Sequence, residues 1–450
     1  MRFVLDVFYV LAAVAISPMV VYRIVRYKRY RAGWAQRFGK IATKNPHKKC
    51  IWLHAVSVGE LNAAKTVIEA LENRFPDFEI VISTTTDTGF SRARALFGKH
   101  QQVFYFPLDF SWIMRRAFRR IAPAMCLLME LEVWPNFVEI AHRLNVPVIV
   151  VNGRISDKSL SRYKKVKPFV KKIFRKVTLV LAQTQEYAER FRDLGCPDER
   201  VVVTGSLKYD TAEITDKVEG ADTLATQLFG TITNHKSKIA NRLWVAGATG
   251  PGEEEIILDV YKDLARQGQF SDLRLVIVPR KPERFDEVAE LIKQKGFDLI
   301  RYSRVKRLAT EHTESAEKSL INYQLSIILG DTMGDLRKFY CLATVIFVGR
   351  SLVPMGGSDM MEAAALGKCT IFGPYAFNFK QAVDALLAGS GAIMVKDKEE
   401  LLRTIRKCLS EPAFAQEIAR NGREVIRKNQ GATAGTIQQI AGFLKATDLS

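Results

Sequence analysis

The chain has 450 residues, too many for one ordinary hydrophobic core and suited to two domains of common size. Hydrophobic residues make up 48% and charged residues 26%, a globular composition that excludes a mainly disordered chain. The net charge of +19 favours an anionic partner, which could be nucleic acid, an anionic membrane surface or a phosphorylated substrate.

The first predicted element is an apolar run at residues 3–22, FVLDVFYVLAAVAISPMVVY. About 20 helical residues span about 30 Å, the thickness of a bilayer core. Basic residues follow from Arg23 to Lys49 without an acid, so the positive-inside rule predicts a membrane anchor at residues 1–25, with the rest of the chain in the cytoplasm. The alternatives are a cleaved signal peptide, which the lone Arg2 before the run disfavours, and an interfacial helix in the inner leaflet.

Residues 26–225 are predicted to form a first Rossmann-like domain. Strands are expected at residues 51–55, 79–83, 103–106, 124–129, 146–151, 179–182 and 201–205, with helices between them that include 61–74 and 91–97. Short apolar strands separated by helices predict a parallel sheet covered on both faces. Residues 210–240 are polar, and we expect them to form the linker and the entry to the second half.

The alternation restarts in residues 226–450, the second predicted domain. Strands are expected at residues 243–246, 273–278, 326–329, 344–348 and 370–372, and helices at 253–267, at 282–295, from 360 and from 399. The fold class is therefore α/β, with two Rossmann-like domains facing a central cleft. Ligands of such sheets bind beyond the carboxyl ends of the strands, so this cleft is the expected site.

Charged residues follow three predicted strands of the first half. In HAVSVGE, Glu60 follows Gly59 at a helix start, where it is either a helix N-terminal charge or the general base that inverting sugar transfer needs. In MELEVWPN, Glu130 and Glu132 lie on one side if the strand continues, either as a solvated strand end or facing the cleft. Lys208 in GSLKYD is either a solvated charge or a group beside the cleft.

Anion-binding turns are predicted in the second half. Arg280 in PRKPERF can bind a phosphate or carboxylate through its guanidinium fork. Gly356 and Gly357 precede a helix and can present backbone N–H groups to an anion, and Glu362 can accept hydrogen bonds from ribose hydroxyls. The turn GPYAFNF, which contains Asn378, is of the same strand-to-helix type.

Several common sites have no counterpart in the sequence. No GxGxxG follows a strand, and there is no P-loop, no DxD motif in a suitable loop and no HExxH or HxH pair. The six cysteines form no CxxC pair, which indicates free thiols in a reducing compartment. The sequence therefore predicts neither a metal ion nor a cofactor.

Eight motifs in this order resemble the bacterial Kdo transferases, lipopolysaccharide enzymes that attach the acidic eight-carbon sugar Kdo to lipid A: HAVSVGE, ISTTTDTGF, YFPLD, MELEVWPN, VNGRIS, GSLKYD, PRKPERF and the GG…E…GP…NF series. The resemblance implies a metal-independent, inverting GT-B glycosyltransferase that moves Kdo from CMP-Kdo to a lipid A precursor of the lipid IV-A type. It implies that the first half takes the acceptor and the second half CMP-Kdo. It also implies a place at the cytoplasmic face of the bacterial inner membrane.

The resemblance further implies roles for individual residues. The catalytic base falls on Glu60, with a second carboxylate at Glu130 and a lysine at Lys208. Donor contacts fall on Arg280, Gly356, Gly357, Glu362 and Asn378, and further acceptor-side positions are Ser57, Gly59, Glu132 and Arg154. This chain reads Gly356-Gly357-Ser358-Asp359 where the family usually has GGHN.

Two other functions compete with this interpretation. One is a GT-B transferase that uses a UDP-sugar on another membrane glycolipid. The other is a membrane-anchored basic protein that binds nucleic acid or another anionic polymer without catalysis. Aromatic RNP-like motifs and helix-turn-helix patterns are absent from the sequence, so we expect no nucleic-acid partner.

Overall fold

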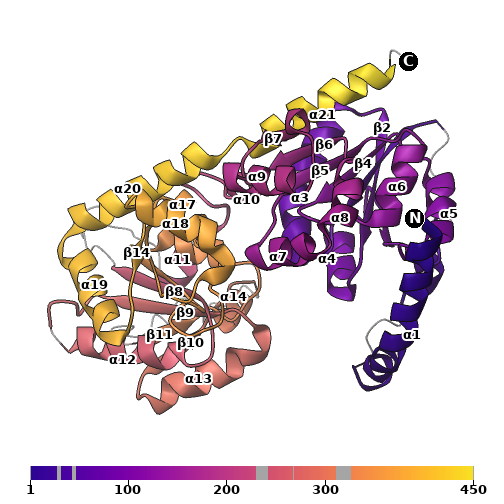
Figure 1. Ribbon diagram of the computed structural model, residues 1–450. Coiled ribbons are helices and arrows are strands. Elements are labelled where there is room, and N and C mark those ends of the chain that lie inside the picture. The colour runs from indigo at the N-terminus through magenta and orange to yellow at the C-terminus, as the bar shows by residue number, and fades with distance from the viewer. Residues whose placement is uncertain are drawn as a thin grey trace. The chain divides into compact units, whose positions relative to one another are not determined.

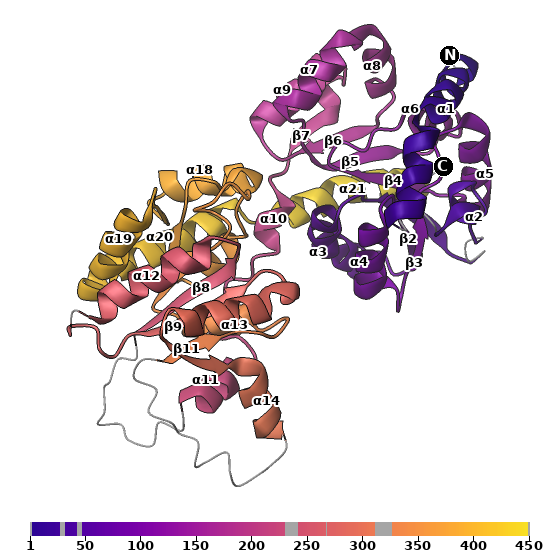
Figure 2. The ribbon, with the colours of Figure 1, turned by 90° about the horizontal axis from the view of Figure 1, so that it is seen from below.

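The computed structural model describes residues 2–27, 32–42, 47–229, 242–266, 268–310 and 326–448. The chain divides into two compact units, Met1–Thr211 with Asn429–Ser450 (the first unit) and Ala212–Lys428 (the second unit). Each unit contains a seven-stranded parallel sheet with helices against it (Figure 1; Figure 2). The predicted α/β class with two Rossmann-like domains is therefore confirmed.

The sheet of the first unit has the strand order β3-β2-β1-β4-β5-β6-β7, and its strands all run parallel. The strands are β1 (Lys49–His54), β2 (Phe78–Thr84), β3 (Gln102–Tyr105), β4 (Met125–Met129), β5 (Val148–Gly153), β6 (Leu179–Ala182) and β7 (Val201–Val203). The order reverses between β1 and β4. At such a switch point the loops after adjacent strands diverge and leave room for a ligand.

Both faces of this sheet are buried, because successive side chains of each strand enter opposite cores. Along β1, Trp52 packs with aromatic residues such as Phe118 and Phe137, whereas Ile51 and Leu53 pack into the other core. The first core is covered by α5 (Ser111–Ile121), α6 (Pro135–Arg143), α8 (Lys167–Phe174) and α9 (Gln185–Asp193), and the second by α3 (Val58–Arg74), α4 (Asp87–Phe97), α10 (Leu207–Asp210) and α21 (Ala432–Asp448). Smaller elements are α2 (Trp34–Arg37), α7 (Asp157–Lys165) and η1 (Asp198–Arg200).

The predicted N-terminal apolar run forms helix α1 (Arg2–Tyr27), which packs against α5 (Figure 1). Within the described ranges, no helix combines the length and the apolar composition that crossing a bilayer requires. The membrane anchor predicted at residues 1–25 is therefore not supported. Two polar side chains of α1 form hydrogen bonds within the first unit, Tyr9 with Asp109 and Asp6 with Ser111.

The sheet of the second unit has the order β10-β11-β9-β8-β12-β13-β14 and is also parallel. Its strands are β8 (Leu243–Thr249), β9 (Arg274–Pro279), β10 (Asp298–Arg301), β11 (Ser326–Leu329), β12 (Val345–Val348), β13 (Cys369–Phe372) and β14 (Ile393–Met394). Its helices are α11 (Ala221–Phe229), α12 (Glu253–Ala265), η2 (Pro282–Arg284), α13 (Phe285–Gln294), α14 (Tyr302–Thr310), α16 (Leu336–Leu342), α17 (Met361–Ala365), η3 (Phe377–Phe379), α18 (Lys380–Ala388), α19 (Lys398–Ser410) and α20 (Pro412–Asn429).

The structure differs from the sequence expectations at the edges of this unit. The edge strands β10 and β14 are not predicted, because one is a half-exposed run that contains charged residues and the other has only two residues. The second unit begins at Ala212 rather than at residue 226, since α11 packs against α14 and α16. Residues 230–241 of the predicted linker lie outside the described residues, as do Lys28, Arg29, Arg31 and Lys44 of the predicted basic stretch.

Candidate active site

A pocket of about 620 Å³ lies at the carboxyl ends of the strands in the first unit, a usual size for a ligand site. The loop after β4 contributes Glu130, Glu132 and Trp134, and the loop after β5 contributes Arg154. Tyr9 of α1 forms another part of the wall. The pocket therefore joins three residues that the sequence predicts, namely Glu130, Glu132 and Arg154, at the switch point of the sheet.

Glu60 lies at the third position of α3 and forms a capping box with Ser57. The Ser57 hydroxyl accepts a hydrogen bond from the Glu60 N–H, and the Glu60 carboxylate accepts from the N–H groups of Val56 at 2.8 Å and Ser57 at 3.2 Å. Glu60 therefore does cap the helix N-terminus, because these bonds satisfy backbone N–H groups that have no partner within the helix. Glu60 is nevertheless only 8% exposed, and burial raises the pKa of its carboxyl.

The sequence predicts Glu130 and Glu132 on one side of the chain only if the strand continues through them. The structure shows that it does not continue. β4 ends at Met129, and Glu130 adopts a left-handed conformation with φ 53°. The Glu130 N–H donates to the Val151 carbonyl at 2.9 Å, which fixes this turn against β5. A left-handed non-glycine residue is strained and persists where the surroundings impose it, often at functional sites. Both glutamates reach the pocket through the turn.

Three carboxylates of the switch point are electrostatically coupled. Burial, assisted by the charges of Glu60 and Glu130, raises the pKa of Glu132 to about 7. The indole of Trp134 donates a hydrogen bond to Glu132 at 3.1 Å and opposes this rise. Burial also raises the pKa of Glu60, and the charge of Glu130 adds to that effect. Mutually repelling carboxylates resist full ionisation, so Glu60 and Glu132 keep a proton to higher pH than ordinary glutamates do.

His54 ends β1 beneath this cluster and is completely buried. Burial lowers its pKa to about 3, so the imidazole is neutral and its 4.0 Å approach to Glu132 is not an ion pair. The Ser83 carbonyl oxygen, 3.1 Å from Nδ1, can only accept, which places the imidazole proton on Nδ1. Nε2 then presents a lone pair toward Glu132, and among the described residues it has no hydrogen-bond partner.

The other predicted residues of the first unit lie around the same end of the sheet. Ser57 and Gly59 are exposed at the start of α3, and a Cβ on Gly59 would meet only the Ser57 hydroxyl, at 3.8 Å. The packing of the chain therefore leaves open space at Gly59. Lys208 is half-buried in α10, which follows β7, but it is not among the residues that line the pocket.

A polar network attaches α1 to the wall of this pocket. Asp109, 8% exposed, accepts hydrogen bonds from the Tyr9 hydroxyl at 3.0 Å and from the first-turn N–H groups of α6, those of Asn136 at 3.0 Å and Phe137 at 2.8 Å. Asp6 accepts from the Ser111 N–H at 2.8 Å. Burial raises the pKa of Asp109 to about 7. One carboxylate thus caps α6 and holds Tyr9 in place.

In the second unit, the predicted glycine turn and Asn378 meet. Gly356 and Gly357 adopt left-handed conformations with φ 91° and 81°, and a Cβ on Gly356 would come within 2.1 Å of the Asn378 side chain. The Gly357 N–H donates to the Arg350 carbonyl at 2.7 Å, and the Asn378 N–H donates to the Gly356 carbonyl at 3.1 Å. Glycine is required here for both conformation and space.

The two glycines precede the helix α17, and their contact with an anion stays a prediction. α17 begins at Met361, after the two glycines, and the Gly357 N–H is already bonded within the turn. Glu362 lies in the first turn of α17, half-buried; burial and the charge of Asp359 raise its pKa, while Arg337 and Arg280 oppose the rise. Arg280 itself is exposed after β9. For binding a ligand, the second unit therefore has the exposed guanidinium of Arg280 and the carboxyl of Glu362, whose pKa is raised.

Glu253, at the start of α12, is a buried carboxylate that sequence analysis missed. It accepts hydrogen bonds from the N–H groups of Gly250 at 3.0 Å, Ser351 at 2.7 Å and Leu352 at 2.9 Å, and also from that of Arg350. These donors form an anion-binding nest that the protein fills itself. Glu253 therefore holds the turn after β12 in shape and leaves those N–H groups unavailable to a donor phosphate.

Two candidate functional residues are absent from the sequence predictions, namely Tyr9, which lines the pocket, and His54, which is buried next to Glu132. Two polar residues, Asp6 and Tyr9, interrupt the N-terminal apolar run, and this interruption could have indicated a contact with the rest of the protein. The place of His54 at the end of a predicted strand could have indicated a histidine near the site. Within the described part of the chain, no group of three histidine, cysteine, aspartate or glutamate side chains is arranged to hold a metal ion.

Comparison with known proteins links both units to one family. A family profile described as 3-deoxy-D-manno-octulosonic-acid transferase (kdotransferase) matches residues 32–211. A 3-deoxy-D-manno-octulosonic acid transferase of Haemophilus influenzae is 32% identical over 94% of this chain and 92% of its own length. One from Bordetella pertussis is 30% identical over 97% of this chain and 99% of its own length. A solved glycosyltransferase from Rickettsia africae has the same fold, with a TM-score of 0.55 at 12% identity over 90% of this chain and 100% of its own.

Proposed function

The chain belongs to the 3-deoxy-D-manno-octulosonic acid (Kdo) transferase family of glycosyltransferases, and on that premise we propose that it moves Kdo from CMP-Kdo to a lipid A precursor of the lipid IV-A type. The proposal includes inversion at the anomeric carbon, with neither metal ion nor cofactor. It places the enzyme at the cytoplasmic face of the bacterial inner membrane. The acceptor is assigned to the first unit and CMP-Kdo to the second.

The observation that carries this proposal is the coupled carboxylate cluster at the switch point of the first unit, in which Glu60 is buried and Glu130 and Glu132 are half-buried. Inverting transfer needs one group that is ionised often enough to take a proton and held firmly enough to meet the attacking hydroxyl. Glu60 satisfies both requirements, because two backbone N–H groups fix its carboxylate while burial raises its pKa toward the range useful at neutral pH. Glu130 and Glu132 tune that pKa through their charges.

The proposed reaction then runs in one displacement. Glu60 takes the proton of the acceptor hydroxyl as its oxygen forms a bond to the anomeric carbon of Kdo. The bond between that carbon and the phosphate oxygen of CMP breaks at the same time, and CMP leaves with the bonding electrons. The phosphate of CMP gains negative charge as this bond breaks, so cationic side chains near it stabilise the transition state. The carboxylate of the donor and the phosphates of the acceptor are also anions that cationic side chains can bind.

Basic residues are assigned to these anions according to their positions. Arg154 lines the pocket beside Glu130, and Lys208 lies at the same end of the sheet, so both are assigned to acceptor phosphates. Arg280 is exposed after β9 and is assigned to the phosphate or carboxylate of CMP-Kdo. We assign Gly356 and Gly357 to forming the turn that contacts the nucleotide, with Asn378 packed against that turn. Glu362 is assigned to hydrogen bonds with the ribose hydroxyls of the nucleotide.

Exposed apolar side chains on α1 support the membrane location. Phe8, Leu11 and Val14 are 63%, 64% and 66% exposed although they are large and apolar. A helix with such a side can lie in the headgroup region, which corresponds to the interfacial alternative for the N-terminal segment. Because Tyr9 of the same helix lines the pocket, a glycolipid in that leaflet would lie next to the carboxylates.

One assay decides the reaction. The purified full-length protein is given CMP-Kdo generated in place and a tetraacylated lipid A precursor, and the products are read by mass spectrometry. The expected result is a mass increase of the acceptor by whole Kdo units together with release of CMP. Parallel reactions with UDP-sugars test the alternative donor class, and glycolipid product formed from a UDP-sugar but not from CMP-Kdo would overturn the proposal.

A further inference from the structure

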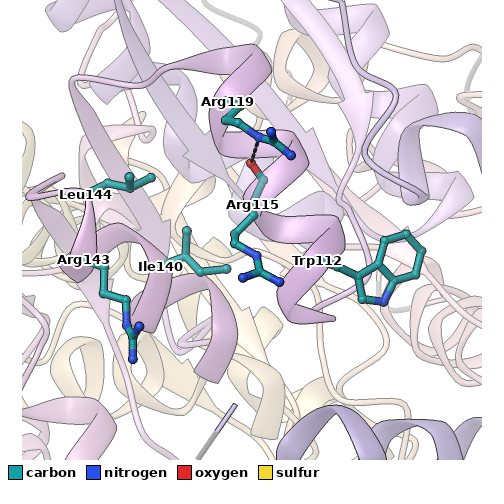
Figure 3. Close-up of a pocket in the computed structure, with 6 residues that line it drawn as sticks. All are labelled: Trp112, Arg115, Arg119, Ile140, Arg143 and Leu144. Atoms are coloured by element: carbon teal, nitrogen blue, oxygen red, sulfur yellow. Dashed lines mark hydrogen bonds between the residues drawn. The ribbon is translucent and has the colours of Figure 1, made fainter. Parts of the chain in front are cut away.

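The first unit contains a second pocket, of about 560 Å³, between α5 and α6. Its lining residues are Trp112, Arg115 and Arg119 of α5, Ile140 and Arg143 of α6, and Leu144, which directly follows α6 (Figure 3). None of these six residues is among those that line the pocket with Glu130 and Glu132. The second pocket is therefore separate from the candidate active site.

Its charge is positive and largely unopposed. Trp112, Arg115 and Arg119 share one side of α5 because they are three and four positions apart, and Figure 3 shows Arg115 extending between Ile140 and Trp112. In the described part of the chain, neither Arg115 nor Arg119 forms an ion pair, and Arg119 donates only through Nε to the Arg115 carbonyl, at 3.4 Å. Their terminal guanidinium nitrogens remain available for a phosphate.

Glu139 is an acid beside this pocket, and two basic groups already offset its charge. Glu139 of α6 is 7% exposed and accepts from Arg143 Nε at 2.7 Å and from Lys176. The pair with Arg143 uses one edge of that guanidinium, so the local balance stays positive. Charge complementarity therefore requires an anionic occupant.

The pocket also presents apolar surface. Trp112 is 49% and Leu144 is 53% exposed, whereas Ile140 is buried beneath them. Trp112 stacks on Phe38 at 6.3 Å between ring centroids and contacts Phe110 at 6.4 Å. An occupant made only of phosphate would leave these apolar side chains in water, whereas an amphiphile would cover them.

The aromatic row leads from this pocket to α1. Phe110, which contacts Trp112, also contacts Tyr9 of α1 at 5.8 Å, edge to face. Phe38 at the other side of Trp112 is 40% exposed, as is Trp34. Tryptophan, tyrosine and arginine are the residues that gather where protein meets lipid headgroups. Aromatic contacts therefore connect the pocket to α1.

We infer that the pocket between α5 and α6 binds the headgroup of an anionic phospholipid in the leaflet on which α1 lies. Arg115, Arg119 and the outer edge of Arg143 hold the phosphate, and Trp112 and Leu144 cover the glycerol and the first acyl carbons. This site goes beyond the proposed function, since it concerns neither the sugar donor nor its acceptor. It would hold the carboxylate pocket at a fixed height and orientation over the bilayer.

Quenching by brominated lipids tests the inference. The full-length protein is bound to vesicles that contain either brominated phosphatidylglycerol or brominated phosphatidylcholine, and tryptophan fluorescence is compared at equal vesicle-bound protein. The test variant is Arg115→Gln with Arg119→Gln. The control, Arg94→Gln with Lys99→Gln, removes the same charge from exposed positions at the end of α4. Trp112→Phe identifies the reporting side chain.

The expected result is stronger quenching by the brominated anionic lipid, lost in Trp112→Phe. Each arginine replaced in the pocket weakens the anionic-lipid preference about fivefold, and the control retains it. Glycerol phosphate in solution does not remove the preference. Equal quenching by the two lipids, an equal loss in the control, or full displacement by glycerol phosphate would each overturn the inference. Because no sugar transfer is measured, failure here is distinct from failure of the proposed reaction.

Discussion

Replacing Glu60 with glutamine tests whether this carboxylate is a base as well as a helix cap. Glutamine retains the shape and one acceptor oxygen, but its amide nitrogen can no longer accept from one of the two N–H groups of Val56 and Ser57. The lost bond costs about 1–2 kcal/mol of unfolding free energy. Loss of the base lowers kcat about 10²–10⁴-fold, which corresponds to about 3–5 kcal/mol in the barrier.

These two effects are separable, because a domain stable by about 5–15 kcal/mol stays folded after losing about 1–2 kcal/mol. Thr184→Ala is the matched control, since Thr184 caps α9 by accepting from the Tyr187 N–H at 3.2 Å, and α9 contributes no residue to the pocket. It should lose about 1 kcal/mol of stability and retain kcat. Initial rates with CMP-Kdo and lipid acceptor, together with urea unfolding, measure both quantities. Turnover by Glu60→Gln within a few-fold of the parent would refute the assignment of the base.

Three further predictions concern the two neighbours Glu130 and Tyr9 of the first unit and the glycine turn of the second unit. The acidic limb of the kcat/KM profile should lie above the ordinary glutamate pKa, because the base form of Glu60 is lost as pH falls through its raised pKa. Glu130→Gln should move that limb to lower pH, because it removes a charge that raises the pKa of Glu60. An unmoved limb would contradict the coupling between the two carboxylates. Tyr9→Phe removes the hydroxyl bonded to Asp109 and should speed deuterium exchange of the α1 amides about fivefold, so unchanged exchange would show that this bond does not hold the helix. Gly357→Ala puts a Cβ 2.9 Å from the Ala376 Cα at a φ of 81° and should destabilise the second unit by about 2–3 kcal/mol in calorimetry. The control Gly268→Ala, at a φ of 62° with open space around it, should cost about 1 kcal/mol of stability. Equal costs for the two variants would show that the turn at Gly357 can relax.

Asp109, which accepts a hydrogen bond from Tyr9 of α1, should also make the stability of the protein depend on pH. Its folded pKa of about 7 exceeds that of an ordinary aspartate because of burial, so the native state holds this proton over a pH range in which the unfolded chain has released it. The contribution of this group therefore makes the protein less stable as pH rises between the two pKa values. Asp109→Asn should flatten that part of the stability profile, because the asparagine carries no proton to release.

The sequence by itself determined the two sheets and the positions of the pocket residues along the chain. Apolar runs such as those around Trp52 and Val245 alternate with helical segments, and burial on both faces requires that pattern in a parallel sheet. Parallel strands end at one edge, so residues that directly follow strands, such as Glu130 and Arg154, gather there. Order along the chain was enough to place them together.

Only the tertiary structure decided the environments of those residues. The raised pKa of Glu60, the left-handed turn at Glu130 and the buried imidazole of His54 depend on neighbours that lie far away in the sequence. The same holds for α1, where hydropathy predicts a spanning segment but Asp6 and Tyr9 find partners near residue 110. The physical reason is that local pattern fixes which side of an element is buried, whereas pKa, hydrogen bonding and exposure are set by what packs against that side.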